Sequence, residues 1–218
     1  MAPMSNVTKI SRPRGRPAKD KAEYAEIRDR LIREGVALLT EKGFASTNLD
    51  EIVKKAGVPK GSFYAYFENK EAFGLELIDD YARYFERKLD KCYGNIVRSP
   101  LERISDFMLE ARENMARFDF RRGCLVGNLG QEMAVLPGSY RQRLVDVFRD
   151  WEVKTEACLR AAQGAGEIDS GIDCAKKAEA FWIGWEGAIL RAKLGRSAGP
   201  IDRYAEDFLD GLRPKSTL

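Results

Sequence analysis

Apolar residues recur at helical spacing from the first quarter of the chain onward. They first line one helical face at Ile27, Leu31, Leu38 and Leu39. Gly43 follows this run, and glycine commonly ends a helix. The pattern therefore predicts an amphipathic helix that ends just before Gly43.

Two short apolar runs come next, and each predicts a helix of only a few residues. In "STNLDEIVKKAG", Thr47 or Asn48 can cap the helix and Gly57 follows its end. In "VPKGSFYAYF", Pro59 suits a first helical position. The pattern thus changes from one long helix to two short helices joined by "KAGVPK".

The rest of the chain predicts long helices separated by glycine- and proline-rich turns. After "ENK", apolar residues recur in steps of four from Phe73 to Leu89, and the pattern ends near Gly94. No alternating runs rich in valine and threonine indicate a sheet, so we expect an all-α fold. The later helices are expected at residues 101–118, 124–135, 140–162, 174–194 and 201–212.

The two short helices after a longer one form a helix-turn-helix pattern, whose second helix can enter the major groove of DNA. Gly57 lets the chain turn with positive φ. We expect Phe63 and Phe67 to face the core. The outward residues of the second helix are then Lys60, Ser62, Tyr64 and Tyr66, while Gly61 allows close backbone approach and Lys70 meets phosphate.

The stretch "FASTNLDEIVKKAGVPKGSFYAYFENKEAF" resembles the DNA-binding segment of the TetR family of bacterial repressors. The resemblance implies a palindromic operator bound by a homodimer, and release when a small inducer enters the C-terminal bundle. Tyr66 departs from the family pattern, because many relatives have histidine there. The DNA contacts that the resemblance implies are Thr47, Lys60, Gly61, Ser62, Tyr64, Tyr66 and Lys70. A plain three-helix core with solvated lysines is the alternative.

Charge is concentrated at the N-terminus. Residues 1–21 hold six basic residues and one acidic residue, whereas the net charge of the whole chain is only +3. Within this arm, "PRGRP" resembles an AT-hook core, in which arginines flanking a glycine suit a narrow minor groove. We therefore expect Arg14, Gly15 and Arg16 to contact DNA; a solubilising tail is the alternative.

These features divide the chain into three parts. We expect a basic flexible arm over 1–21, a helix-turn-helix DNA-binding domain over 22–70, and a helical-bundle ligand-binding and dimerisation domain over 71–218. In "IGWEGAILRAK", Gly184, Gly187, Ala188 and Arg191 share a small-residue face. Such a face permits close helix approach, as at a dimer seam.

The composition argues against an enzyme. The chain has no histidine, and it contains neither a phosphate-binding glycine loop nor a paired-cysteine metal motif, so we expect no cofactor and no metal. Its four cysteines lie far apart and are expected to be reduced thiols in a cytoplasmic, nucleoid-associated protein. No apolar run is long enough to span a membrane.

The C-terminal half contains one distinctive stretch, "RRGCLVGNLGQE". Cys124 stands at a predicted helix start after Arg121 and Arg122, and both features favour a thiolate. A small buried cysteine is the alternative. "GCLVGN" resembles electrophile- and acrylate-responsive members of the family, so the expected ligand is acrylate or another small electrophile in a narrow pocket. The expected ligand-binding residues are Cys124, Arg121, Trp182 and Trp185; for the tryptophans, ordinary core is the alternative.

Two functions from different classes remain compatible with these residues. The first is a ligand-responsive transcriptional repressor, and the second is an architectural DNA-binding protein that needs no ligand. A DNA titration with and without small molecules separates them, because only the repressor releases its DNA.

Overall fold

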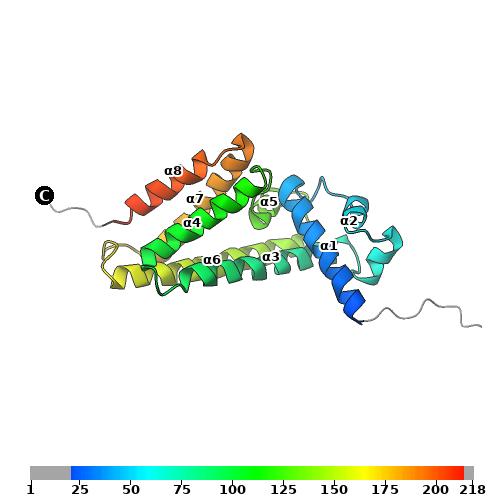
Figure 1. The fold of residues 1–218 in the computed structure, drawn as a ribbon, viewed down its shortest axis with the longest axis horizontal. Helices are drawn as coiled ribbons and strands as arrows, with labels where there is room; N and C mark the ends of the chain where they lie inside the picture. Colours follow the sequence, from blue (N-terminus) through cyan, green and yellow to red (C-terminus); the bar gives the residue numbers. More distant parts are fainter. Residues whose placement is uncertain (1–20, 214–218) are drawn as a thin grey trace, which may run out of the picture.

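The computed structural model describes residues 21–213, and this part of the chain is almost entirely helical (Figure 1). The predicted all-α fold is confirmed. No helix among these residues combines the length and apolar character needed to cross a membrane. In chain order the elements are α1 Lys21–Lys42, α2 Leu49–Lys55, the 3₁₀ helix η1 Lys60–Ala65, α3 Lys70–Tyr93, α4 Pro100–Arg117, α5 Leu125–Gln131, α6 Gly138–Gly164, α7 Cys174–Gly195 and α8 Gly199–Asp210.

Local signals end and begin the N-terminal helices where the sequence predicts. Gly43 follows α1 with φ of 84°, and Gly57 follows α2 with φ of 66°, a backbone region that favours glycine. Of the two candidate caps for α2, Asn48 takes that position, because its side chain accepts the N–H of Glu51 at 2.8 Å.

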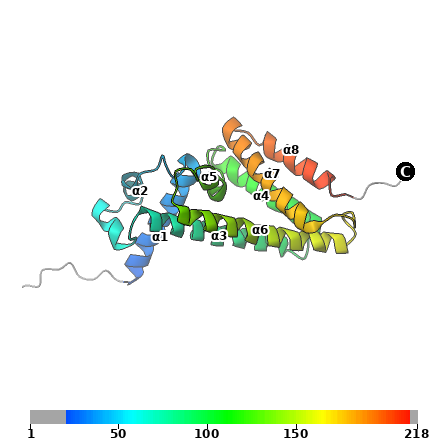
Figure 2. The ribbon, with the colours of Figure 1, turned by 180° about the vertical axis from the view of Figure 1, so that it is seen from behind.

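The helix α3 connects the two parts of the molecule. Figure 1 shows α1 and α2 at one end and α3 running from them along α6, and Figure 2 shows α7 and α8 side by side. Asn69 caps α3 by accepting the N–H of Ala72 at 2.8 Å. Because α3 begins at Lys70, the predicted boundary between 22–70 and 71–218 lies at its first turn, and that division stays a prediction.

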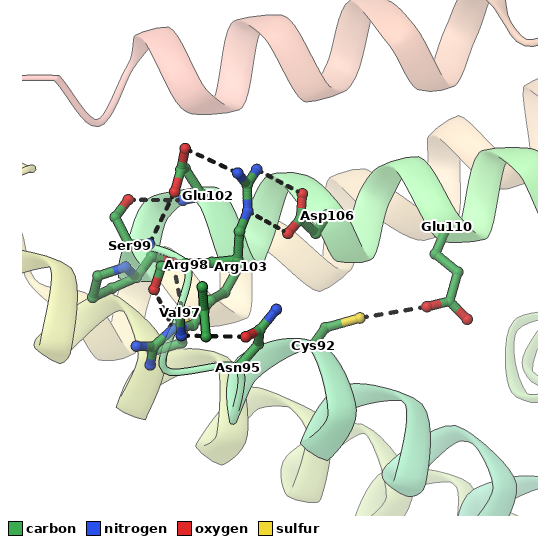
Figure 3. Close-up of polar contacts among 11 residues, drawn as sticks. Cys92, Asn95, Val97, Arg98, Ser99, Glu102, Arg103, Asp106 and Glu110 are labelled. Atoms are coloured by element: carbon green, nitrogen blue, oxygen red, sulfur yellow. Dashed lines mark hydrogen bonds and ion pairs between the residues drawn. The ribbon is translucent and has the colours of Figure 1, made fainter.

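The turn between α3 and α4 is held by a polar cluster (Figure 3). Ser99 and Glu102 form a capping box at the start of α4. Arg98 then donates from Nε and Nη2 to the carboxylate of Asp106, at 2.9 and 3.0 Å. These contacts fix the angle at which α4 returns along α3.

Aromatic rings fill the centre of the C-terminal bundle. The ring centroids of Trp151 and Trp182 lie 4.9 Å apart, and Phe85 stands 4.3 Å from Trp151. Trp182 also donates from Nε1 to the hydroxyl of Thr155 at 3.0 Å, so its only polar atom is satisfied inside the core.

Two helix predictions need correction. The helix expected over 124–135 ends at Gln131, where the carboxylate of Glu132 turns to accept two backbone N–H groups of the loop after α1. The segment expected to be a short recognition α-helix is the 3₁₀ helix η1.

Candidate functional site

The helix-turn-helix presents a small exposed face at η1. Tyr64 is 64% exposed, and Lys60 and Gly61 are exposed beside it. The ammonium of Lys60 forms an ion pair with Asp50 at 2.8 Å, and this hydrogen bond raises the pKa of Lys60. Ser62 is half-buried. Lys60 therefore stays a cation at the surface, where an anion can reach it.

Phe63 anchors this face from below, as the sequence predicts. It is fully buried, and its ring lies 5.3 Å from Phe67 and 5.2 Å from Phe73. Tyr64 touches only the edge of Phe63, at 5.4 Å. The aromatic cluster thus holds η1 in place while Tyr64 projects outward.

Tyr66 faces inward, although the sequence predicts that it faces outward. It is buried, and its ring lies 4.6 Å from that of Tyr24 in α1. A 3₁₀ helix has three residues per turn, so residues three apart lie on the same side. Tyr66 therefore follows Phe63 toward the core. An α-helix also places residues three apart on one side, so the expectation that put Tyr66 beside Tyr64 did not follow helical spacing.

Thr47 and Lys70 also point inward, which corrects the prediction that both face DNA. The hydroxyl of Thr47 donates to the carbonyl of Gly43 at 2.7 Å. The ammonium of Lys70 donates to the carbonyl of Thr47 at 2.9 Å and lies 4.2 Å from the ring centre of Phe44. Burial lowers the pKa of Lys70. These two residues brace the turn before α2.

The predicted contacts of the arm, Arg14, Gly15 and Arg16, lie outside the described residues. Their assignment to the minor groove stays a prediction.

A cavity of about 440 Å³ lies between the helix-turn-helix and the bundle. It is lined by residues of α1, α3, α4 and α7 and by the segment before α5, among them Val36, Thr40, Tyr81, Phe107, Cys124 and Trp185. The sequence predicts a narrow pocket, whereas this volume falls within the range of ordinary small-molecule sites. The cavity therefore has room for more than the smallest ligands.

Cys124 lines this cavity, but as a neutral thiol. It caps α5 by accepting the N–H of Gly127 at 3.5 Å. Burial, reinforced by the nearby Glu186, raises the pKa of Cys124 well above its ordinary value. Of the two interpretations that the sequence left open for Cys124, the structure agrees with the small buried cysteine and not with the thiolate, because the loss of solvation outweighs any helix or arginine effect. The expectation of reduced thiols is met, since all four cysteines are free and buried.

Of the other three predicted ligand-binding residues, one lines the cavity and two do not. Trp185 lines the cavity. Trp182 does not, because it belongs to the aromatic core with its N–H bound to Thr155. Arg121 is exposed and lies outside the cavity wall, whereas its neighbour Arg122 lines the cavity and stacks on Phe118 at 4.1 Å.

Glu186 is the pocket residue that the sequence reasoning missed. Its carboxyl group packs against α5, where a Cβ at position 127 would collide with Oε2. Burial raises the pKa of Glu186 to about 7, while the Cys124 thiol lowers it in part. The available signal was one acid inside the apolar run "AFWIGWEGAIL", where a charge needs a reason.

The cavity reaches the DNA-binding unit through the end of α1. The carbonyl of Thr40 accepts the N–H of Gly123 at 3.2 Å, Nδ2 of Asn128 at 3.0 Å and Nζ of Lys193 at 2.9 Å. Thr40 and Gly123 both line the cavity. These hydrogen bonds join the wall of the cavity to the last turn of α1.

The small-residue face predicted on α7 is divided in the structure, because Gly187 and Arg191 are exposed whereas Gly184 and Ala188 are not. Gly184 faces inward, because a Cβ there would collide with the ring of Tyr204 in α8, and Ala188 is buried. The exposed surface of α7 carries a stripe of apolar residues beside charged ones. The members of this stripe recur at helical spacing and are Ile183, Gly187, Leu190 and Leu194.

Comparison with known proteins identifies both halves of the chain. Residues 31–77 match the family model described as bacterial regulatory proteins, tetR family. Residues 100–208 match the model described as tetracyclin repressor-like, C-terminal domain.

Individual relatives agree with this assignment. The chain is 50% identical over 197 residues to the transcriptional regulator AcuR of Cereibacter sphaeroides, covering 90% of this chain and 88% of that protein. A crystal structure of regulatory protein TetR from Rhodobacter sphaeroides superposes with a TM-score of 0.83 at 50% identity, over 84% of this chain and 97% of the other. Reduced NemR of E. coli superposes with a TM-score of 0.77 at 25% identity, over 87% of this chain and 100% of the other.

These relatives are regulators of transcription and not enzymes. With a helix-turn-helix at one end and a ligand-sized cavity at its junction with a helical bundle, the chain belongs to the TetR family of transcriptional regulators.

Proposed function

We propose that this protein is a ligand-responsive repressor. It binds a palindromic operator as a homodimer in the cytoplasm and releases the DNA when a small molecule enters the cavity. The observation that carries the proposal is the position of the cavity, which is lined at once by Thr40 of α1 and by Trp185 of α7. A ligand there contacts the DNA-binding unit and the bundle together.

Four residues of η1 are assigned to the operator. Lys60 supplies a cation to phosphate, Gly61 allows close approach, and Ser62 and Tyr64 offer hydroxyl groups. Thr47, Tyr66 and Lys70 support this face from within. Arg14, Gly15 and Arg16 follow the adjacent minor groove, where arginine is attracted by the narrow A·T-rich groove.

The homodimer is assigned to the outer face of α7. Ile183 is 70% exposed and Leu194 is 83% exposed, although both are large apolar residues. Gly187 lies between them with no side chain in the way. A second copy of this chain, packed on the same face about a two-fold axis, covers the stripe and sets the spacing of the two η1 helices.

Acrylate is the first candidate inducer, and another small electrophile is the second. The support is the resemblance of "GCLVGN" to acrylate- and electrophile-responsive members, together with the position of Cys124 in the cavity wall. The raised pKa of Cys124 favours reversible binding over addition of the thiol, because the thiolate is the nucleophile.

The test measures operator binding by the fluorescence anisotropy of labelled operator DNA. Acrylate is added to the preformed complex of protein and operator. Release by acrylate, but not by chloride at equal ionic strength, is the expected result. Binding that no candidate ligand alters would favour the alternative, an architectural DNA-binding protein. Induction also requires that the ligand bind the DNA-incompetent conformation more tightly than the competent one.

A further inference from the structure

Glu186 of α7 places an unpaired acid at the cavity. Its Oε1 is shielded from solvent and has no hydrogen-bond partner among residues 21–213. Buried carboxyl oxygens are nearly always satisfied in native proteins, so this atom calls for a partner that enters from outside the chain. The cavity wall is where such a partner would arrive.

The surroundings of Glu186 favour the neutral acid. Its neighbours are the Cys124 thiol and the Tyr81 hydroxyl, which burial keeps protonated. No ion pair within residues 21–213 includes Glu186, and burial is the main influence on its pKa. The remaining charged groups at the cavity are Arg33 of α1, Asp80, Arg87 and Lys88 of α3, Glu110 of α4 and Arg122 before α5.

The charges around the cavity favour an anion nonetheless. Lys88 is paired with Glu110 at 2.9 Å, and Asp80 is paired with Arg83 at 3.4 Å. Arg33, Arg87 and Arg122 have no carboxylate partner in the described part of the chain. These three guanidinium groups attract an anionic ligand into the cavity. Once there, the anion is repelled by Glu186 if that carboxyl group is ionised, and it is not repelled if Glu186 is protonated.

We propose that the cavity takes up an anionic, carboxylate-bearing inducer together with one proton, which Glu186 holds. The inference rests on the proposed function, since it concerns the same inducer cavity. The proton comes from solvent, and no covalent bond changes. Neutral Glu186 donates its O–H to an oxygen of the ligand carboxylate, and the pair shares one negative charge.

The proposal makes acrylate affinity depend on pH. Acrylate stays ionised between pH 6 and 8, so the proton requirement falls on Glu186. Since the free acid titrates near pH 7, affinity is full below that value and is lost as pH rises through it. Acrylate should bind about tenfold more weakly at pH 8 than at pH 6.

Isothermal titration calorimetry with acrylate and DNA-free protein tests this. At pH 8, heats measured in phosphate and in Tris should differ by the uptake of about one proton per site. Glu186→Gln keeps a donor but cannot titrate, so it should bind acrylate equally at both pH values. Glu110→Gln, at an acid of the same cavity that is paired with Lys88, should keep the tenfold dependence.

Equal acrylate affinity of the wild-type protein at pH 6 and 8, without proton uptake, overturns the inference. Operator release measured alongside then shows whether the proposed repressor function still stands. Absence of binding at pH 6 rejects the inference and acrylate as inducer together. If Glu186→Gln does not fold, the number of protons that the wild-type protein takes up on binding acrylate decides whether the inference stands.

Discussion

The ammonium of Lys193 in α7 donates a hydrogen bond of 2.9 Å to the backbone carbonyl of Thr40, which is 153 residues earlier in the chain. The bond joins the helix that carries Trp185 and Glu186 to the last turn of α1. It is thus one of the direct links between the helix that lines the cavity and the DNA-binding unit.

Lys193→Met should weaken the coupling between ligand and DNA. The variant removes a hydrogen bond from a charged donor, so stability should fall by about 1 to 2 kcal/mol. Operator release should need more acrylate, because the cavity holds α1 less firmly. Anisotropy titrations and thermal melting measure both effects. Lys176→Met on the exposed face of α7 is the matched control, and equal effects of the two variants would contradict this role.

Tyr64→Ala should abolish specific operator binding and leave the fold intact, because Tyr64 is largely exposed. Phe63→Ala should instead lower the stability by about 3 to 5 kcal/mol, since Phe63 is completely enclosed. Thermal melting and operator titration separate the two outcomes. Operator affinity of Tyr64→Ala equal to wild type would remove η1 from the interface.

Lys60→Ala and Lys70→Ala should differ in their salt dependence. Loss of a phosphate contact at Lys60 should lower the slope of log affinity against log salt by about one. Lys70 is held by the Thr47 carbonyl, so Lys70→Ala should mainly reduce stability. Titrations at several salt concentrations, with melting curves, decide this. A drop of one in the slope for Lys70→Ala would show that its ammonium turns outward on DNA.

Deletion of residues 1–20 should reduce operator affinity without changing thermal stability. The described helices begin with α1 at Lys21, so none of the described core residues is removed. The loss should be greatest for operators with A·T-rich flanks, because those have the narrowest minor groove. Operators that differ only in their flanks provide the comparison, and an equal loss for all of them would reject minor-groove binding by the arm.

Cys124 should react slowly with electrophiles at neutral pH. Its raised pKa keeps the thiolate fraction low, and that fraction rises only as pH approaches the raised value. Intact-mass measurement after incubation with acrylate at pH 7 should therefore find no adduct at Cys124. Cys124→Ser should still release the operator. An adduct on Cys124, together with loss of response in Cys124→Ser, would establish covalent sensing instead.

The sequence by itself determined the helices and the family. Apolar spacing places α1, α3, α6 and α7 within a few residues of their observed bounds, because an amphipathic helix is encoded by neighbours three and four apart. The caps are equally local, as the glycine after α1 and Asn48 before α2 illustrate. Tyr66 was misplaced although it lies three residues after the buried Phe63, a spacing that puts both on one side of a helix.

Only the tertiary structure decided where the cavity lies and which residues line it. Cys124 is thiol rather than thiolate, and Trp182 is core rather than wall, because neighbours distant in sequence bury both. The same packing joins Lys193 to Thr40 and turns Gly184 toward Tyr204. It also sets the proton affinity of Glu186, since desolvation depends on every element that surrounds a group and no local pattern in the sequence encodes it.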